Sequence, residues 1–323
     1  MQQEKVLSFL INNKGSHISG QAIAGELGVT RAAIWKAVEA LREVGYEIES
    51  LPARGYRLAG VPDLLTSREI SLGLDTRTLG RRIYSLKEVD STNTFAVRLA
   101  ADGEPEGSIV VAEVQTAGRG RLGRKWVAPP NVNILMSLIL RPEIPPQDAP
   151  MATLVAGVAV AGALNRHYGL GAGIKWPNDV LVDGKKVAGI LTEMSAEPER
   201  VRHIVVGIGI NVNMPAQAFP RDIRDASTSV MAILGRKVNR AEMLRHILAE
   251  FEGCYEALKS TDRRSILERW RGLSCTLGRT VKVSTFAGSM TGTAVDIDED
   301  GRLIVESEDG VRRTVTAGDV SVI

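Results

Sequence analysis

The chain has 323 residues, of which 44% are hydrophobic and 24% are charged, a balance typical of globular proteins that bury a core. The formal net charge of +2 excludes a strong general attraction to polyanions, so a nucleic-acid function has to rest on local features. Two cysteines without C-x-x-C spacing argue against a disulfide scaffold and against a zinc site, and they are typical of a reducing cytoplasm.

The N-terminal stretch MQQEKVLSFLINN lacks the pattern of a signal peptide. Residues 4–46 then show helical periodicity, and Gly28-Val29-Thr30 separates the second apolar group from the third. Thr30 is a candidate N-cap for a helix that begins at Arg31. The run YEIESLPARGYRLAG has two alternating segments around a turn, which predicts a β-hairpin. Three helices and a hairpin form a winged helix-turn-helix, which we place at residues 1–62, with VPDLLT (61–66) as a linker.

The third helix, Thr30 to Val44, is the candidate recognition helix. Ile34, Val38 and Leu41 take its inward positions, which leaves Arg31, Ala32, Trp35, Lys36 and Arg42 facing outward, while Arg54 and Arg57 lie on the wing. Residues 1–60 carry seven basic and six acidic side chains, so DNA binding is inferred from geometry and not from charge. We expect DNA contacts from Arg31, Ala32, Trp35, Lys36, Arg54 and Arg57. A winged helix that binds only protein is the alternative.

Residues 67–272 mix apolar strands with helical segments at 91–101, 150–168 and 240–259 without strict alternation, which favours an α+β domain with a mixed sheet. The bland stretch from Met151 to Leu164 is rich in Ala and Gly and shorter than the roughly 18 residues that a membrane span requires, so we expect a packed core helix and no membrane partner. Short alternating runs separated by DEDG and SEDG predict a small β-barrel at residues 273–323.

The stretch GRGRLGRKW (118–126) satisfies G-x-G-x-x-G, but Pro129 and Pro130 exclude the long helix that a dinucleotide-binding turn must open. No acidic residue occurs between Glu113 and Glu143, while five Arg and Lys residues do. Glycines allow close backbone approach, and arginines offer bidentate donors to carboxylate or phosphate. The pattern predicts a loop that closes over an anionic ligand. A solvated basic loop or a nucleic-acid contact is the alternative.

Two further stretches contain polar residues that could contact a ligand. In KWPNDVLVDGKKVAGILTE (175–193), Asp183-Gly184 predicts a two-residue hairpin. Strict alternation puts Lys186 on the face of Ala188 and Ile190, and Lys185 on the face of Val187 and Leu191. One of the two lysines should face inward, and periodicity does not decide which. The alternative is that both lysines flank an exposed hairpin tip. In DSTNTFAVRLA (90–100), Asp90 or Ser91 is a candidate N-cap, with a capping role alone as the alternative to a ligand contact.

Together, GRGRLGRKW, KWPND with Lys186 seven residues beyond Asp179, the trailing AGIL, STN and GIGINVN (207–213) resemble the biotin–protein ligase family. The segment RAAIWKAVEALREVGYEIESLPARGYRL resembles the bifunctional, repressor form of that family. The resemblance runs nearly end to end. It implies a class II synthetase-like catalytic domain and an SH3-like C-terminal barrel.

The resemblance also implies a reaction. Biotin and ATP would give biotinyl-5′-AMP and pyrophosphate, with Mg²⁺ at the triphosphate, and biotin would pass to a lysine of a biotin carboxyl carrier protein. Biotin would be bound by Ser91, Thr92, Asn93, Gln115, Arg119, Gly120, Arg121 and Lys186. Arg124, Trp126 and Asn211 would serve the adenylate. Lys186, Arg121 and Asp179 would be catalytic, Asp179 either acting on the incoming lysine or bracing the turn. No residue is expected to form a dedicated metal site.

For regulation, the resemblance implies a homodimer when biotinyl-AMP is bound, and this dimer would bind operator DNA. Two other functions stay open on the residues alone. A lipoate–protein ligase uses the same chemistry, and a non-enzymatic regulator would sense a small anion through a degenerate ligase domain.

Overall fold

The computed structural model describes residues 2–13, 15–52, 54–260, 262–285 and 288–323. The protein folds as two compact units, Met1–Leu64 and Leu65–Ile323. The domain boundaries expected at 62–67 and 272–273 stay predictions.

The first unit is a winged helix-turn-helix, as expected. Thr30 Oγ1 accepts a hydrogen bond from the backbone N–H of Ala33 at 3.2 Å and so caps the third helix. Gly28 ends the second helix in the left-handed conformation, with φ of 64°. Ile34, Val38 and Leu41 are fully buried, which confirms the inward face. The elements are α1 (Gln2–Asn12), α2 (Gly20–Leu27), α3 (Arg31–Glu43), β1 (Glu47–Leu51) and β2 (Gly55–Gly60).

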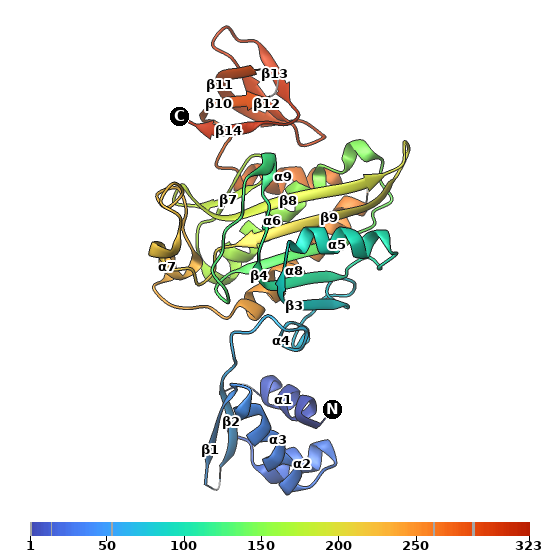
Figure 1. Ribbon diagram of the computed structural model, residues 1–323, viewed down its shortest axis with the longest axis vertical. Helices are drawn as coiled ribbons and strands as arrows, with labels where there is room; N and C mark the ends of the chain where they lie inside the picture. The colour runs from blue at the N-terminus through green and yellow to red at the C-terminus, as the bar shows by residue number, and fades with distance from the viewer. Residues whose placement is uncertain (1, 14, 53, 261, 286–287) are drawn as a thin grey trace. The chain divides into compact units, whose positions relative to one another are not determined.

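The second unit is built on a mixed seven-stranded sheet of order β3-β4-β5-β9-β8-β7-β6 (Figure 1). Only β3 and β4 run parallel, and every other neighbouring pair is antiparallel, which confirms the predicted mixed sheet. The strands are β3 (Ile83–Val89), β4 (Ile109–Gln115), β5 (Ile134–Leu140), β6 (Gly173–Lys175), β7 (Asp179–Val182), β8 (Lys185–Ala196) and β9 (Val201–Ile210).

Helices cover both faces of this sheet (Figure 1). On one face α5 packs Ala96 and Ala100 against Val110, Ile139 and Val205. On the other face α6, α8 and α9 enclose the larger core. The helices are α4 (Ser67–Ser71), α5 (Thr92–Ala101), α6 (Met151–Tyr168), α7 (Val230–Leu234), α8 (Arg240–Lys259) and α9 (Arg263–Leu273).

The stretch that includes helix α6 is longer than the sequence predicted. The helical stretch Pro146–Tyr168 is long and apolar enough to cross a membrane, so a length limit does not exclude a span. However, 78% of its most apolar window is buried inside the protein. Ala and Gly fill much of α6, and small side chains let it pack closely against α8 and the sheet. Burial therefore identifies α6 as a core helix.

The C-terminal strands form a five-stranded antiparallel sheet of order β13-β12-β11-β10-β14. It is joined to the rest of the second unit by hydrogen bonds: Trp176 Nε1, between β6 and β7, donates to the Gly301 carbonyl at 3.0 Å, and Arg271 Nε of α9 donates to Asp296 Oδ1 at 2.7 Å. The strands are β10 (Thr280–Thr285), β11 (Gly288–Ile297), β12 (Leu303–Glu306), β13 (Arg312–Val315) and β14 (Asp319–Val322).

Candidate functional site

A cavity of about 800 Å³ lies in the second unit, between the N-terminus of α5, the hairpin of β7 and β8, strand β9 and the loop at 116–133. The C-terminal sheet contributes Asp319, Ser321 and Val322 to its wall. The cavity brings together all the residues that the sequence predicted for the ligase site: Ser91, Thr92, Asn93, Gln115, Arg119, Gly120, Arg121, Arg124, Trp126, Asp179, Lys186 and Asn211.

Glycines of neighbouring strands form the floor of the cavity. Gly189 of β8 pairs directly with Gly209 of β9, and Gly207 lies two residues before Gly209. A Cβ atom on Gly209 would lie 2.6 Å from Trp126 Cε2, and one on Gly189 would lie 3.0 Å from Trp126 Cζ3. Gly209 and Gly189 therefore leave room for the Trp126 indole on the backbone of the sheet, whereas Gly207 leaves room for the Asn93 side chain.

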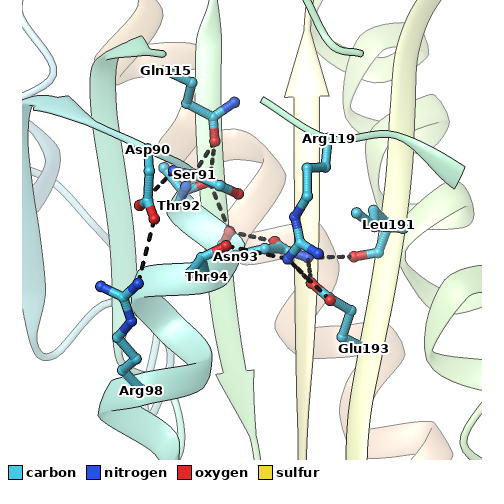
Figure 2. Close-up of polar contacts among 11 residues, drawn as sticks. Asp90, Ser91, Thr92, Asn93, Thr94, Arg98, Gln115, Arg119, Leu191 and Glu193 are labelled. Carbon is cyan, nitrogen blue, oxygen red and sulfur yellow. Dashed lines mark hydrogen bonds and ion pairs between the residues drawn. The ribbon is translucent and has the colours of Figure 1, made fainter. Parts of the chain in front are cut away.

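The N-terminus of α5 is held by polar contacts with β4 and β5 (Figure 2). Gln115 Oε1 accepts hydrogen bonds from the backbone N–H of Thr92 at 2.7 Å and from Thr92 Oγ1 at 3.0 Å. The buried Ser137 Oγ lies 2.8 Å from Thr92 Oγ1 and 2.6 Å from Asn93 Oδ1. Sequence reasoning missed Ser137, because a serine within an apolar strand gives no signal of its own.

Ser91 occupies the N-cap position of α5, but its side chain makes no capping hydrogen bond. Asp90 does not cap the helix either, because its Oδ1 accepts from the adjacent N–H of Ser91 at 2.7 Å. Ser91 is therefore the N-cap residue, as predicted, but the expected side-chain capping hydrogen bond is absent. Gln115 supplies the acceptor for the Thr92 N–H instead, which leaves the Ser91 hydroxyl at the cavity wall.

The arginine loop folds back on itself across the cavity. The backbone N–H of Gly120 donates to the Arg124 carbonyl at 2.7 Å, and that of Trp126 donates to the Gly118 carbonyl at 2.9 Å. Between them, Arg121–Gly123 form a single 3-10 turn, so no helix follows the glycines and the dinucleotide-binding interpretation is excluded. Leu122 adopts φ of 55°, a conformation that costs a residue with a Cβ about 1 kcal/mol.

Each arginine of the loop contacts a protein group. Arg119 Nη2 donates to Glu193 at 3.0 Å. Arg121 donates to Asn178 Oδ1 at 3.1 Å and to the Gly318 carbonyl at 3.2 Å, and burial lowers the pKa of its guanidinium, which nevertheless stays charged at neutral pH.

Arg124 pairs with Asp319 of β14. The sequence predicted a loop that closes over an anionic ligand and is not preformed, whereas in the structure ion pairs already hold it to Glu193 of β8 and Asp319 of β14.

Lys186 is the inward lysine of the β7–β8 hairpin, but not on the predicted face. Its Nζ lies 2.6 Å from Asp179 Oδ1 and 5.7 Å from the centre of the Trp126 ring, above Gly189. Ala188 and Ile190 instead point into the core.

The reason is a shift in register. Lys186 is opposite Leu181, whereas Ala188 is opposite Val180, so strand β8 holds an extra residue, Val187, at this point. A bulge of one residue reverses the faces that strict alternation assigns. The hairpin itself is confirmed, with Asp183 and Gly184 at φ of 49° and 74°.

Asn211 is buried at the far wall. Its Oδ1 accepts from Asn133 Nδ2 at 3.2 Å, and its Nδ2 donates to the Thr228 carbonyl at 3.1 Å. The segment before Thr228 runs beside β8, since the N–H of Lys186 donates to the Ala226 carbonyl at 2.8 Å. Asn211 thus holds in place the segment up to Thr228, which lies beside Lys186.

The predicted DNA-contacting residues lie in the first unit. Arg31, Ala32, Trp35, Lys36 and Arg54 are exposed, and Trp35 is 55% exposed. Arg57 is paired with Glu49 across the wing at 2.7 Å. Arg42 does not face solvent freely as expected, because its guanidinium donates to the Ile48 carbonyl and to Ser50 Oγ of the wing.

Comparisons with known proteins match this architecture along the chain. The biotin/lipoate A/B protein ligase family matches residues 85–211, an HTH domain family matches residues 2–57, and the biotin protein ligase C-terminal domain matches residues 276–322.

Relatives match over nearly the whole length. The bifunctional ligase/repressor BirA of Bacillus spizizenii is 42% identical over 97% of both chains, and that of Escherichia coli is 30% identical over 98% of this chain and 96% of its own. Among solved structures, biotin protein ligase from Aquifex aeolicus in complex with biotin and ATP aligns with a TM-score of 0.65 at 32% identity, covering 75% of this chain and 99% of that one. The chain therefore belongs to the family of bifunctional biotin ligase/repressors.

Proposed function

We propose that this protein joins biotin to AMP in the 800 Å³ cavity and then transfers the biotin to a lysine of the biotin carboxyl carrier protein of acetyl-CoA carboxylase. The observation that carries the proposal is the convergence of Lys186, Arg121 and Trp126 on one glycine-floored cavity. Three arginines and Lys125 of the loop, together with Lys186, line a space large enough for a vitamin and a nucleotide.

In the first step, an oxygen of the biotin carboxylate attacks the α-phosphate of ATP, the bond to the β-phosphate breaks, and pyrophosphate leaves. Both reactants are anions, so their approach requires cations. Lys186 Nζ and the Arg121 guanidinium are assigned to the carboxylate and to the charge that develops at the α-phosphate. Arg124 and Trp126 are assigned to the phosphate and to the adenine ring. Mg²⁺ supplies further neutralisation of the triphosphate when it is bound.

In the second step, the amine of the carrier lysine attacks the mixed anhydride, and AMP leaves. Asp179 was expected either to act on this amine or to brace the turn. Its 2.6 Å contact with Lys186 Nζ supports a third role, the orientation of Lys186. Ser91, Thr92, Asn93, Gln115, Arg119 and Gly120 are assigned to biotin, and Asn211 to the nucleotide side.

The hairpin supplies a matched pair of variants for testing Lys186. Lys186→Ala should lower the rate of biotin-dependent pyrophosphate release by about 10²–10³-fold, as expected for the loss of one preorganised group that stabilises developing charge. Lys185→Ala removes an exposed lysine from the adjacent position and should leave the rate unchanged. Equal rates for the two variants would end the assignment of Lys186.

We further propose that the first unit binds operator DNA as part of a homodimer that biotinyl-AMP promotes. The exposed face of α3 and the wing supply a surface that fits a major groove and its flanking phosphates. Ligand-driven dimerisation would link the two activities, because only a dimer spans two half-sites. Because the proposed carrier protein and operator occur in the cytoplasm, we expect the protein to act there. The measurement is operator affinity with and without biotin and ATP; equal affinities would refute the linkage.

An assay of biotin-dependent pyrophosphate release and of transfer to the carrier distinguishes this function from two others. Lipoate used in place of biotin would indicate a lipoate–protein ligase, and binding without transfer would indicate a sensor. The arrangement of Lys186, Asp179 and Arg121 around the cavity favours turnover over sensing.

A further inference from the structure

We propose that Glu193 is a positioning residue for the biotin end of the site, and that it works by holding the side chain of Arg119. The proposal rests on the biotin-binding function proposed above. Glu193 does not line the cavity, whereas Arg119 and Asn93 do, so any effect of Glu193 on a ligand has to pass through these neighbours.

The Glu193 carboxylate joins three separate segments of the chain (Figure 2). Arg119 Nη2 of the loop lies 3.0 Å from both carboxylate oxygens. Asn93 Nδ2 of α5 donates to Glu193 Oε2 at 2.8 Å, and the same Arg119 Nη2 donates to Thr94 Oγ1 at 3.2 Å. Strand β8, the N-terminus of α5 and the entrance to the arginine loop are thus connected at one carboxylate.

This arrangement assigns the Arg119 side chain a supporting role. Nη2 of this guanidinium is held by Glu193 and Thr94, so the contact sets the position of the Arg119 and Gly120 backbone at the cavity wall. The N–H of Gly120 is itself hydrogen-bonded to the Arg124 carbonyl, so fixing Arg119 also fixes the returning half of the loop.

Asn93 has the same supporting character. Its amide donates to the Leu191 carbonyl at 3.1 Å and to Glu193, while its Oδ1 lies 2.6 Å from Ser137 Oγ. The Asn93 side chain also packs tightly against the backbone of β9, since a Cβ atom on Gly207 would lie 2.1 Å from Asn93 Oδ1. Asn93 and Glu193 therefore form a rigid support to which the loop attaches through Arg119.

The ion pair is only partly buried, with 48% of the Arg119 side chain and 31% of the Glu193 side chain exposed. A contact of this exposure changes an equilibrium by about two- to fivefold. We therefore expect a modest effect on biotin affinity and on loop closure. No effect is expected on the chemical step, because Lys186 and Arg121 do not touch Glu193.

The test is a double-mutant cycle with a matched control. Glu193→Gln removes the charge but keeps an acceptor for Asn93 Nδ2, and Arg119→Gln removes the other partner. Glu197→Gln removes an equal charge from a residue just beyond β8, where Glu197 pairs with Arg200 and Arg202 away from the cavity. The readouts are the biotin dissociation constant by calorimetry, KM and kcat for pyrophosphate release, and the rate of protease cleavage within residues 118–126 in the presence of biotin and ATP.

Glu193→Gln is expected to raise the biotin dissociation constant and KM about two- to fivefold, to speed cleavage of the loop, and to leave kcat unchanged. In the Arg119→Gln background the same substitution should have no further effect. Additive effects of the two changes, a fall in kcat without a change in KM, or a Glu193→Gln variant that behaves like Glu197→Gln would overturn the proposal. Failure of the unmodified protein to bind biotin would instead refute the proposed function on which it rests.

Discussion

Gly209 leaves room for the Trp126 indole at the end of the site assigned to the nucleotide. In Gly209→Ala, the new Cβ would lie 2.6 Å from Trp126 Cε2 and 2.7 Å from Cζ2, whereas ordinary contact begins at 3.4 Å. Strand β9 cannot yield, because Gly209 pairs with Leu135 on one side and with Gly189 on the other. The indole must therefore rise by about 0.8 Å, the difference between 3.4 and 2.6 Å, into the cavity.

A displacement of this size at a group that positions the nucleotide is expected to reduce the rate of adenylate formation by about 10- to 100-fold, since a misplacement of 1 Å can cost about 10². Biotin binding in the absence of ATP should stay unchanged, because the contacts around Thr92 and Gln115 lie elsewhere in the cavity. The assays are pyrophosphate release as a function of ATP concentration and calorimetric titration with biotin.

Gly253→Ala is the matched control. A Cβ atom on Gly253 in α8 meets nothing within 4 Å, and alanine should stabilise the helix by up to about 1 kcal/mol without affecting activity. A Gly209→Ala variant with normal kcat and normal KM for ATP would refute the assignment of Trp126 to the nucleotide. So would a variant whose only defect is in biotin affinity.

Three further outcomes are expected. Trp35→Ala on the recognition helix should weaken operator binding by about tenfold, measured by fluorescence anisotropy, with biotin transfer unaffected; unchanged affinity would remove α3 from the interface. Glu49→Gln frees Arg57 from its 2.7 Å ion pair, so operator affinity should rise and the slope of log K against log[salt] should steepen by about 1 per half-site; an unchanged slope would contradict an Arg57 contact with phosphate. Partial burial alone would raise the pKa of Glu252, but hydrogen bonds from the backbone N–H groups of residues 77–79 outweigh it and hold that pKa below its ordinary value of 4.5. The charged carboxylate therefore stabilises the protein above pH 4.5, and this contribution is lost as the pH falls through the lowered pKa. Glu252→Gln should lower the free energy of unfolding by about 1 kcal/mol at neutral pH and by less in acid, followed by urea denaturation; a constant difference across pH would be inconsistent with this reasoning.

Local chemistry made much of the fold predictable. Thr30 caps α3 as expected, because an N-cap acts only on the next three residues. Asp183-Gly184 closes the β7–β8 hairpin because both positions require positive φ. The residues predicted for the ligase site from their resemblance to a known family all line one cavity.

Long-range contacts were not predictable in the same way. Arg124 and Asp319 are 195 positions apart, and no local pattern connects a glycine-rich loop to the strand β14 that pairs with it. The bulge at Val187 was not predictable either, because the alternation of the two faces assumes a regular strand. One extra residue exchanges the faces of all the residues beyond it. No pattern in the sequence singled out Glu193, because its partners Asn93 and Arg119 lie 100 and 74 positions away along the chain.

The proposed function requires this cavity to convert a carboxylate into an acyl adenylate and to transfer the acyl group to a lysine. The most direct measurement follows labelled biotin, first with purified protein, ATP and Mg²⁺, and then after a carrier domain is added. We predict that labelled biotinyl-AMP accumulates on the protein with one equivalent of pyrophosphate, and that the carrier then takes up the label as AMP is released. Absence of the acyl adenylate, or labelling of the carrier without pyrophosphate release, would refute this function.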